Sequence, residues 1–143
     1  MSEAPLFLHA KAAGRVFLLA VSELREVVPG APVTPIPSGP PGIQGVVLHH
    51  GEFLPVLDWA VVGGNPDHAG APLVLAVLRP RLGLPLEGLA GTVEALEGGL
   101  SDPPADDPWG PVLAGVRRLG DEDLPVLDSD RLLALLHRLR KAR

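Results

Sequence analysis

Short apolar runs separated by turn residues make up most of the hydrophobic pattern of this chain. Several runs are apolar at consecutive positions instead of alternate ones, and Gly or Pro residues lie between them. Such runs predict strands that are buried on both faces. Strands are expected at residues 6–10, 15–20, 33–36, 43–49, 53–57, 73–78, 82–86, 92–96, 112–119 and 123–127. One helical turn is predicted at 22–25.

The final segment follows a helical period instead. Asp128, Ser129 and Asp130 offer side chains that accept hydrogen bonds at a helix N-terminus, and their negative charge suits its positive end. Five leucines follow at the spacing of one helix face: Leu132, Leu133, Leu135, Leu136 and Leu139. Basic residues come last, where cations are favoured. The pattern predicts an α-helix over 129–141.

A sequence repeat relates the two halves of the chain. Leu-Pro-Val-Leu-Asp occurs at 54–58 and again at 124–128, an offset of 70 residues. Gly-Val precedes each copy at the same offset, at 45–46 and 115–116. Self-similarity at one offset indicates repeated structural units, and this offset is too long for a solenoid. Two like lobes are therefore predicted, in which the Asp that ends each copy ends a strand or caps the next segment.

Composition favours one compact domain. The chain has 143 residues, of which 46% are hydrophobic, with 17 Gly and 17 Pro. The lack of Cys excludes disulfides and thiolate chemistry. No apolar run approaches the ~20 residues of a membrane span, and neither a signal peptide nor direct membrane insertion is expected. A cytoplasmic location is predicted.

Charge is unevenly distributed along the chain. The net charge is −5, from 12 basic and 17 acidic residues, but five of the basic residues lie at or after Arg131. Residues 1–130 therefore hold 7 basic and 17 acidic groups. Such an acidic body repels phosphates, so nucleic-acid binding is not predicted. The basic tail is interpreted as a solvated helix end.

Motifs for catalysis are missing from the sequence. No Gly-x-Ser-x-Gly elbow, phosphate-binding Gly-rich loop or His-Glu-x-x-His motif occurs, so an enzyme is not predicted. His49 and His50 are the most suggestive pair. Adjacent residues of a strand point to opposite faces, however, and the two would need further ligands, such as Asp58 or His9, to hold one metal. Neither a metal nor a cofactor is predicted.

Aromatic residues are few and offer no platform for base stacking. Phe7, Phe17 and Phe53 lie within predicted strands and are assigned to the core. Trp59 and Trp109 follow a strand and a Pro-rich loop. Each either anchors a partner at the surface or closes one end of the core.

Several short motifs, in order, resemble the CheW-like domain family. They are Leu24-Arg25-Glu26-Val27, Pro35-Ile36-Pro37, Ile43-Gln44-Gly45-Val46 and Gly51-Glu52-Phe53-Leu54-Pro55-Val56-Leu57-Asp58. The resemblance covers residues 6–136. It implies an all-β fold of two five-stranded SH3-like barrel subdomains around a shared core, with a C-terminal α-helix. Subdomain 1 would span about 15–70 and subdomain 2 about 71–128, with strands exchanged from the N-terminus, before helix 129–141.

The resemblance also implies a non-enzymatic adaptor for chemotaxis signal transduction. Proteins of this family link the cytoplasmic tips of chemoreceptors to the regulatory domain of the histidine kinase CheA. By resemblance, the protein-binding residues on the receptor side are Leu24, Glu26, Gly45, His50 and Gly51. Exposed strand edges in such a fold favour weak self-association.

One position departs from the family pattern. The family usually has Arg where this chain has His50, and a guanidinium is always charged whereas an imidazole is mostly neutral at pH 7. A divergent module that binds only the kinase or itself, for example in a pilus-related chemosensory system, is therefore an alternative. A small His/Asp metal-dependent hydrolase is an alternative of another class. It predicts a bound metal that is lost on His49→Ala.

Overall fold

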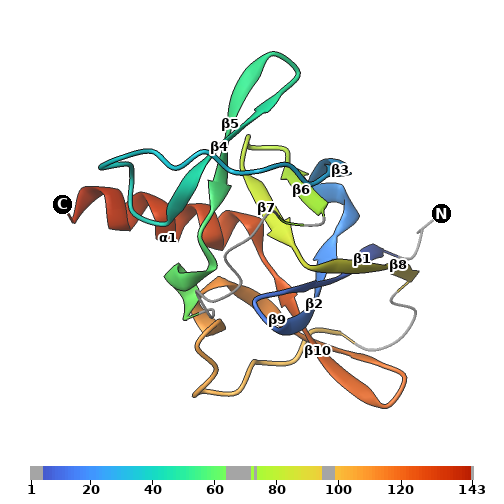
Figure 1. The fold of residues 1–143 in the computed structure, drawn as a ribbon. Coiled ribbons are helices and arrows are strands. Elements are labelled where there is room, and N and C mark those ends of the chain that lie inside the picture. Colours follow the sequence, from blue (N-terminus) through green and yellow to red (C-terminus); the bar gives the residue numbers. More distant parts are fainter. Residues whose placement is uncertain (1–4, 64–71, 73, 95–98, 143) are drawn as a thin grey trace.

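Two five-stranded sheets and a C-terminal helix make up the protein in a computed structural model, which describes residues 5–63, 72, 74–94 and 99–142 (Figure 1). The strands are β1 (Leu6–Ala12), β2 (Arg15–Ala20), β3 (Leu24–Pro29), β4 (Ile43–His49), β5 (Glu52–Leu57), β6 (Val74–Leu78), β7 (Gly83–Leu86), β8 (Gly88–Glu94), β9 (Leu113–Leu119) and β10 (Glu122–Leu127). Short 3-10 turns are η1 (Val21–Glu23), η2 (Trp59–Val62) and η3 (Gly110–Val112), and helix α1 is Ser129–Lys141. The predicted fold class and helix are confirmed.

Each sheet combines strands from both halves of the chain. The first sheet has the order β8-β1-β2-β10-β9, and the second has the order β3-β6-β7-β5-β4. The hairpin that opens each half, β1–β2 or β6–β7, therefore pairs with the last three strands of the other half. Most neighbouring strands are antiparallel, but β2–β10 and β5–β7 are parallel and join the hairpins to the other strands. The two halves are interlocked through the sheets and cannot be separated as independent lobes.

The sequence repeat corresponds to equivalent structure. The strands β4 and β9 begin and end 70 residues apart, and so do β5 and β10. The residue after Gly45 forms an isolated bridge to Thr34, and the residue after Gly115 forms one to Ser101. A Cβ at either glycine would collide with the carbonyl oxygen of the bridging residue. The repeated Gly-Val pair therefore marks a close backbone approach that only glycine permits at each site.

The strand predicted at 33–36 was wrong, and the helical turn predicted at 22–25 was only partly right. Residues 33–36 contribute only the isolated bridge at Thr34, since the prolines at 35 and 37 have no N–H to donate to a strand partner. The helical turn predicted at 22–25 is the shorter turn η1, after which the chain runs on as the unpredicted strand β3 and pairs with β6. Residue 73 and residues 95–96, also predicted as strand, lie outside the described residues.

One large hydrophobic core takes side chains from both sheets and from α1. Trp59 and Trp109 lie inside it, stacked with ring centroids 5.0 Å apart, and Phe17 packs against both rings. The Trp59 indole N–H donates to the Pro85 carbonyl over 2.8 Å. Both tryptophans therefore close the core and are not anchors at the surface. Leu132 and Leu136 bring the stripe of α1 into the same core.

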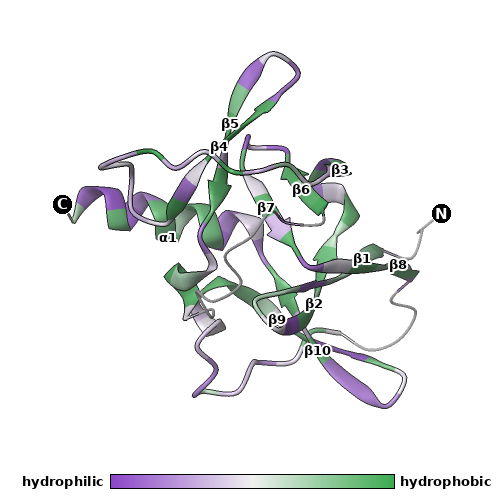
Figure 2. Cartoon of the chain, in the orientation of Figure 1, coloured by the Kyte–Doolittle hydropathy of each residue, from purple (hydrophilic) through white to green (hydrophobic). Residues whose placement is uncertain are grey.

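The distribution of hydrophobic residues agrees with this arrangement. Hydrophobic residues are concentrated in the central strands, whereas the outer part of the β9–β10 hairpin is mostly hydrophilic (Figure 2). Within the described residues, no helix is both long enough and apolar enough to cross a membrane.

Candidate functional site

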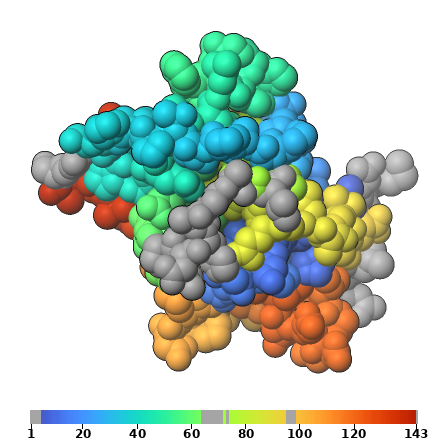
Figure 3. Space-filling view, viewed as in Figure 1, coloured from blue at the N-terminus to red at the C-terminus, as the bar shows by residue number. Residues whose placement is uncertain are grey.

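The β4–β5 hairpin projects from the body of the protein and forms a knob on its surface (Figures 1 and 3). Its two-residue turn consists of His50 and Gly51, whose φ angles are 51° and 77°. Two consecutive residues with positive φ fit the type I′ turn that suits the twist of a hairpin. Gly adopts this conformation without cost, whereas His must be held there by the ladder of β4 and β5.

One face of this hairpin is apolar and exposed. Leu48 and Phe53 are direct cross-strand partners, and they are 70% and 71% exposed. The assignment of Phe53 to the core was wrong, although Phe7 and Phe17 are buried as predicted. Phe53 lies near the outer end of β5, past the body of the sheet, so its strand position does not bury it. Two large apolar side chains presented together on a projecting hairpin are typical of a surface that binds another protein.

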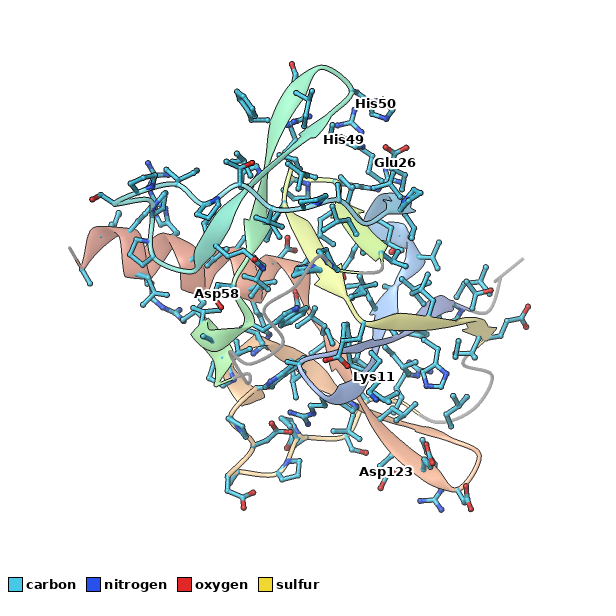
Figure 4. All side chains as sticks on the ribbon, in the orientation of Figure 1. Lys11, Glu26, His49, His50, Asp58 and Asp123 are labelled. Carbon is cyan, nitrogen blue, oxygen red and sulfur yellow. The ribbon has the colours of Figure 1, made fainter. Side chains whose placement is uncertain are left out.

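The other side of the turn brings three polar side chains together. The Oε1 atom of Glu26, on β3, is hydrogen-bonded to His49 Nε2. His50 Nε2 lies 2.8 Å from the same oxygen (Figure 4). The two imidazole rings meet edge to face, with centroids 4.1 Å apart. The expectation that these rings point to opposite faces was wrong. His50 leaves the extended conformation at the turn, so the alternation of a strand does not apply to it.

The electrostatics of this cluster favour an ionised Glu26. Hydrogen bonds from His49 and then from His50 hold the pKa of the Glu26 carboxyl below its usual value. His49 is almost buried, and its Nδ1 atom has no hydrogen-bond partner among the described residues. His50 is largely exposed, with 73% of its side-chain surface accessible. The cluster thus has one inner ring, one outer ring and a shared carboxylate.

The five residues proposed by resemblance occupy three different settings. Glu26 and His50 are in contact, and Gly51 completes the turn beside them, with open space where a Cβ would stand. Leu24 begins β3 and is buried in the main core. Gly45 is buried on β4 against the backbone of Thr34. The structure therefore brings Glu26, His50 and Gly51 together at the surface, whereas Leu24 and Gly45 support the strands that carry them.

The repeated aspartates do not form a catalytic pair. Asp58 Oδ1 accepts the Ala60 N–H over 3.0 Å at the start of η2. Asp128 Oδ1 accepts the Asp130 N–H over 2.9 Å and the Arg131 N–H over 3.2 Å at the start of α1. The interpretation of both as caps is confirmed. Asp58 also lies away from His49, so it is not the further ligand considered for that residue (Figure 4).

An ion pair between distant segments was not found by sequence reasoning. Arg15 on β2 makes a two-pronged contact with the Asp107 carboxylate, and its guanidinium lies 5.0 Å from the centre of the Trp109 ring. Arg15 holds the pKa of Asp107 below its usual value. Both residues line an open cavity of about 440 Å³. Because Arg15 and Asp107 are paired with each other, their contact fastens the 99–112 segment to the sheet, and neither is a free acid or base.

The fold and the site together define a binding domain. An apolar hairpin face is exposed, and the carboxylates that could suggest catalysis cap helices or pair with Arg. A family model described as the CheW-like domain matches residues 6–137, and the chain belongs to this family of non-enzymatic scaffold proteins. The predicted family is confirmed.

A solved structure supports the fold. The chain is similar to the scaffolding protein TtCheW from Thermoanaerobacter tengcongensis, with a TM-score of 0.75 and 18% sequence identity. The similarity covers 90% of this chain and 86% of TtCheW. At that identity it establishes the shared architecture. No curated protein matches the sequence.

Proposed function

We propose that this protein is a cytoplasmic adaptor of a chemosensory array, which couples the cytoplasmic tip of a chemoreceptor to the regulatory domain of the histidine kinase CheA. Membership of the CheW-like family supports the role of scaffold. The observation that carries the proposal is the exposed Leu48–Phe53 pair on a projecting hairpin. A surface of this kind gains free energy when a partner covers it, by roughly 25 cal/mol for each Å² of apolar area buried.

The receptor side of the adaptor is the surface around the turn of this hairpin. Glu26 offers an ionised carboxylate, and His50 offers an exposed ring beside it. Gly51 leaves room for close approach of a partner backbone, since nothing lies within 4 Å of the position that its Cβ would take. Leu24 and Gly45 act through position, because the first anchors β3 in the core and the second sets the distance between β4 and the bridging segment.

The presence of His50 at the usual place of Arg changes the chemistry of this surface. An Arg would carry a permanent charge and five donors, whereas His50 offers a single imidazole, which contacts Glu26. The surface therefore relies more on shape and apolar contact than on charge. Receptor docking on this protein is expected to depend weakly on salt.

A pull-down with the purified chain tests the proposal. The CheA regulatory domain and a receptor tip fragment from the same organism are offered separately and together. Retention of both partners, in a single complex, is the expected result. Retention of the kinase domain alone would replace the proposal by a module that binds only the kinase, and His50→Arg would then be the change that restores receptor binding. Retention of neither partner would contradict the function.

A matched pair of variants assigns the receptor side. Glu26→Ala should reduce retention of the receptor fragment but leave retention of the kinase domain unchanged. Glu52→Ala is the control, since Glu52 is an exposed carboxylate of the same hairpin that pairs with Arg81 instead of the histidines. Equal behaviour of the two variants towards the receptor fragment would contradict the assignment of Glu26.

A further inference from the structure

Three ligand-type side chains converge beside the turn of the β4–β5 hairpin. Glu26, His49 and His50 each offer one atom, and these atoms all lie within 4.8 Å of one another. The carboxylate comes from β3, and the two rings come from the end of β4 and the turn that follows it. The strands β3 and β4 are the two edge strands of the second sheet. Only the folded chain brings them together, because Glu26 and His49 are separated by 23 residues in sequence.

We propose that Glu26, His49 and His50 bind a divalent transition metal of the zinc class, through the carboxylate of Glu26 and the Nε2 atoms of the two histidines. Two imidazoles and one carboxylate form a donor set that zinc accepts, with bonds of about 2.0–2.2 Å. The positions left open by three protein ligands would be filled by water or by a side chain of a bound partner.

The present geometry is close to what such an ion requires. Ligand atoms around a tetrahedral zinc ion lie about 3.3 Å apart, as follows from bonds of that length. His50 Nε2 lies 2.8 Å from Glu26 Oε1, and both side chains reach solvent. A small rotation of these two side chains would open the shared hydrogen bonds and admit the ion. His49 is almost buried and already fixed in place, so it supplies the preorganised ligand.

Charge favours a cation at this place. The Glu26 carboxylate supplies negative charge, and a cation placed between its oxygen and the two ring nitrogens would replace the contacts that these atoms now make to one another. One feature sets a limit on affinity: His49 Nδ1 has no hydrogen-bond partner among the described residues. A metal-bound histidine that lacks such a partner loses about 10–100-fold in affinity.

Titration of the full, tag-free chain with zinc chloride tests the proposal directly. Calorimetry at pH 7.5, in a buffer that does not coordinate zinc, should show one saturable site for each chain. Imidazole ¹⁵N resonances of His49 and His50 should shift on addition of zinc, and those of His9 and His137 should not. Absence of saturable binding would overturn the proposal, as would a shift confined to histidines outside the cluster.

Two variants and a control separate this site from general binding to surface histidines. His50→Ala and Glu26→Gln should each weaken zinc binding by at least about 10-fold, since each removes a direct ligand. His137→Ala removes an exposed histidine from α1 and should leave the affinity unchanged. His50 is exposed, so its loss should leave the circular dichroism spectrum unaltered. If all three variants bound zinc with the affinity of the unchanged protein, the proposal would be overturned. Zinc binding is measured without any partner, so its outcome is independent of kinase and receptor binding.

Discussion

The hairpins β4–β5 and β9–β10 occupy equivalent places in the two sheets, 70 residues apart, and project from opposite ends of the molecule (Figure 1). The cross-strand pair Leu48–Phe53 in the first corresponds to the pair Arg118–Asp123 in the second. The apolar side chains are 70% and 71% exposed, and the charged ones are both 64% exposed. Both pairs are largely exposed on equivalent backbone, yet one pair is apolar and the other is charged.

The difference supports the β4–β5 hairpin as the proposed binding surface. Arg118 and Asp123 form an ion pair over 3.4 Å, which is an ordinary solvated arrangement that contributes about 0–1 kcal/mol to stability. Leu48 and Phe53 are exposed, so each lacks the roughly 1.5–3 kcal/mol of stabilisation that burial of its side chain would contribute. The fold does not need them at these positions, because the other hairpin shows that charged residues serve equally well. A partner surface is the physical reason that fits their exposure.

Exchanging the cross-strand pairs of the two hairpins should have the largest effect on binding of the receptor fragment. The double substitution Leu48→Arg and Phe53→Asp gives the first hairpin the pair found on the second. The affinity for the receptor tip fragment should fall about 100-fold, or ~2.7 kcal/mol, as expected when a central apolar anchor is lost. Surface plasmon resonance measures this effect, and the melting temperature should stay unchanged.

The reverse exchange is the control for that experiment. Arg118→Leu with Asp123→Phe places the apolar pair on the second hairpin and should not alter the affinity for the receptor fragment. If both exchanges lowered the affinity equally, the two hairpins would not differ in function and the comparison would fail.

Alanine at the repeated glycines should give the largest change in stability. Gly45→Ala and Gly115→Ala each place a Cβ against a backbone carbonyl, that of Thr34 or Ser101. Each should lower the free energy of unfolding by about 1–3 kcal/mol, measured by urea denaturation, because the bridge must move apart. Gly88→Ala is the control, since Gly88 lies in a strand with open space around it. If Gly45→Ala and Gly115→Ala were as stable as the control, the bridging segments could move apart at little cost in free energy.

The two equivalent caps should differ in strength. Asp128 accepts two backbone N–H groups and starts the helix of 13 residues, whereas Asp58 accepts one and starts a turn of four. Asp128→Ala should cost about 1 kcal/mol in unfolding free energy, and Asp58→Ala should cost less. Asn at each position retains the acceptor and should restore most of the loss. A larger effect at Asp58 would contradict the assignment of these aspartates as simple caps.

A pH dependence of stability that arises from the contact of Glu26 with His49 and His50 is the smallest expected effect. The pKa of Glu26 lies below its usual value of 4.5 because His49 and His50 donate hydrogen bonds to it. Its contribution to stability is therefore present above the unfolded pKa and is lost as the pH falls below about 4.5, through the lower folded pKa. The stability difference between wild type and Glu26→Gln, measured by urea denaturation, should shrink over that range. A difference that is constant with pH would contradict the contact.

The residues that could be predicted are those whose role depends on local chemistry. The capping aspartates and the leucine stripe determine α1, and the prediction of 129–141 agrees with the structure. The apolar runs locate β4, β5, β9 and β10 to within one residue at either end. The Gly-Val repeat signals the close approach at Gly45 and Gly115, although its cause becomes visible only with the bridging carbonyls in place.

The candidate site was only partly predictable. The resemblance gave Glu26, His50 and Gly51, which the fold does bring together. The contact of His49 with the same carboxylate was missed, because alternation along a strand fails where the chain turns at His50. The exposure of Phe53 was missed for a related reason: an apolar residue in a strand is buried only as far as the sheet is covered.

The sequence by itself determined where the helix and the repeated strands β4, β5, β9 and β10 lie and that the two halves are alike, since propensity, caps and turn residues act over a few neighbours. The tertiary structure alone decided that the opening hairpins β1–β2 and β6–β7 exchange between the halves, and that Trp59 stacks on Trp109 in the shared core. It also decided that Glu26 meets His49 at the end of β4 and His50 in the turn that follows. These outcomes depend on contacts between residues far apart in sequence, and such contacts are formed only when both sheets close on one core.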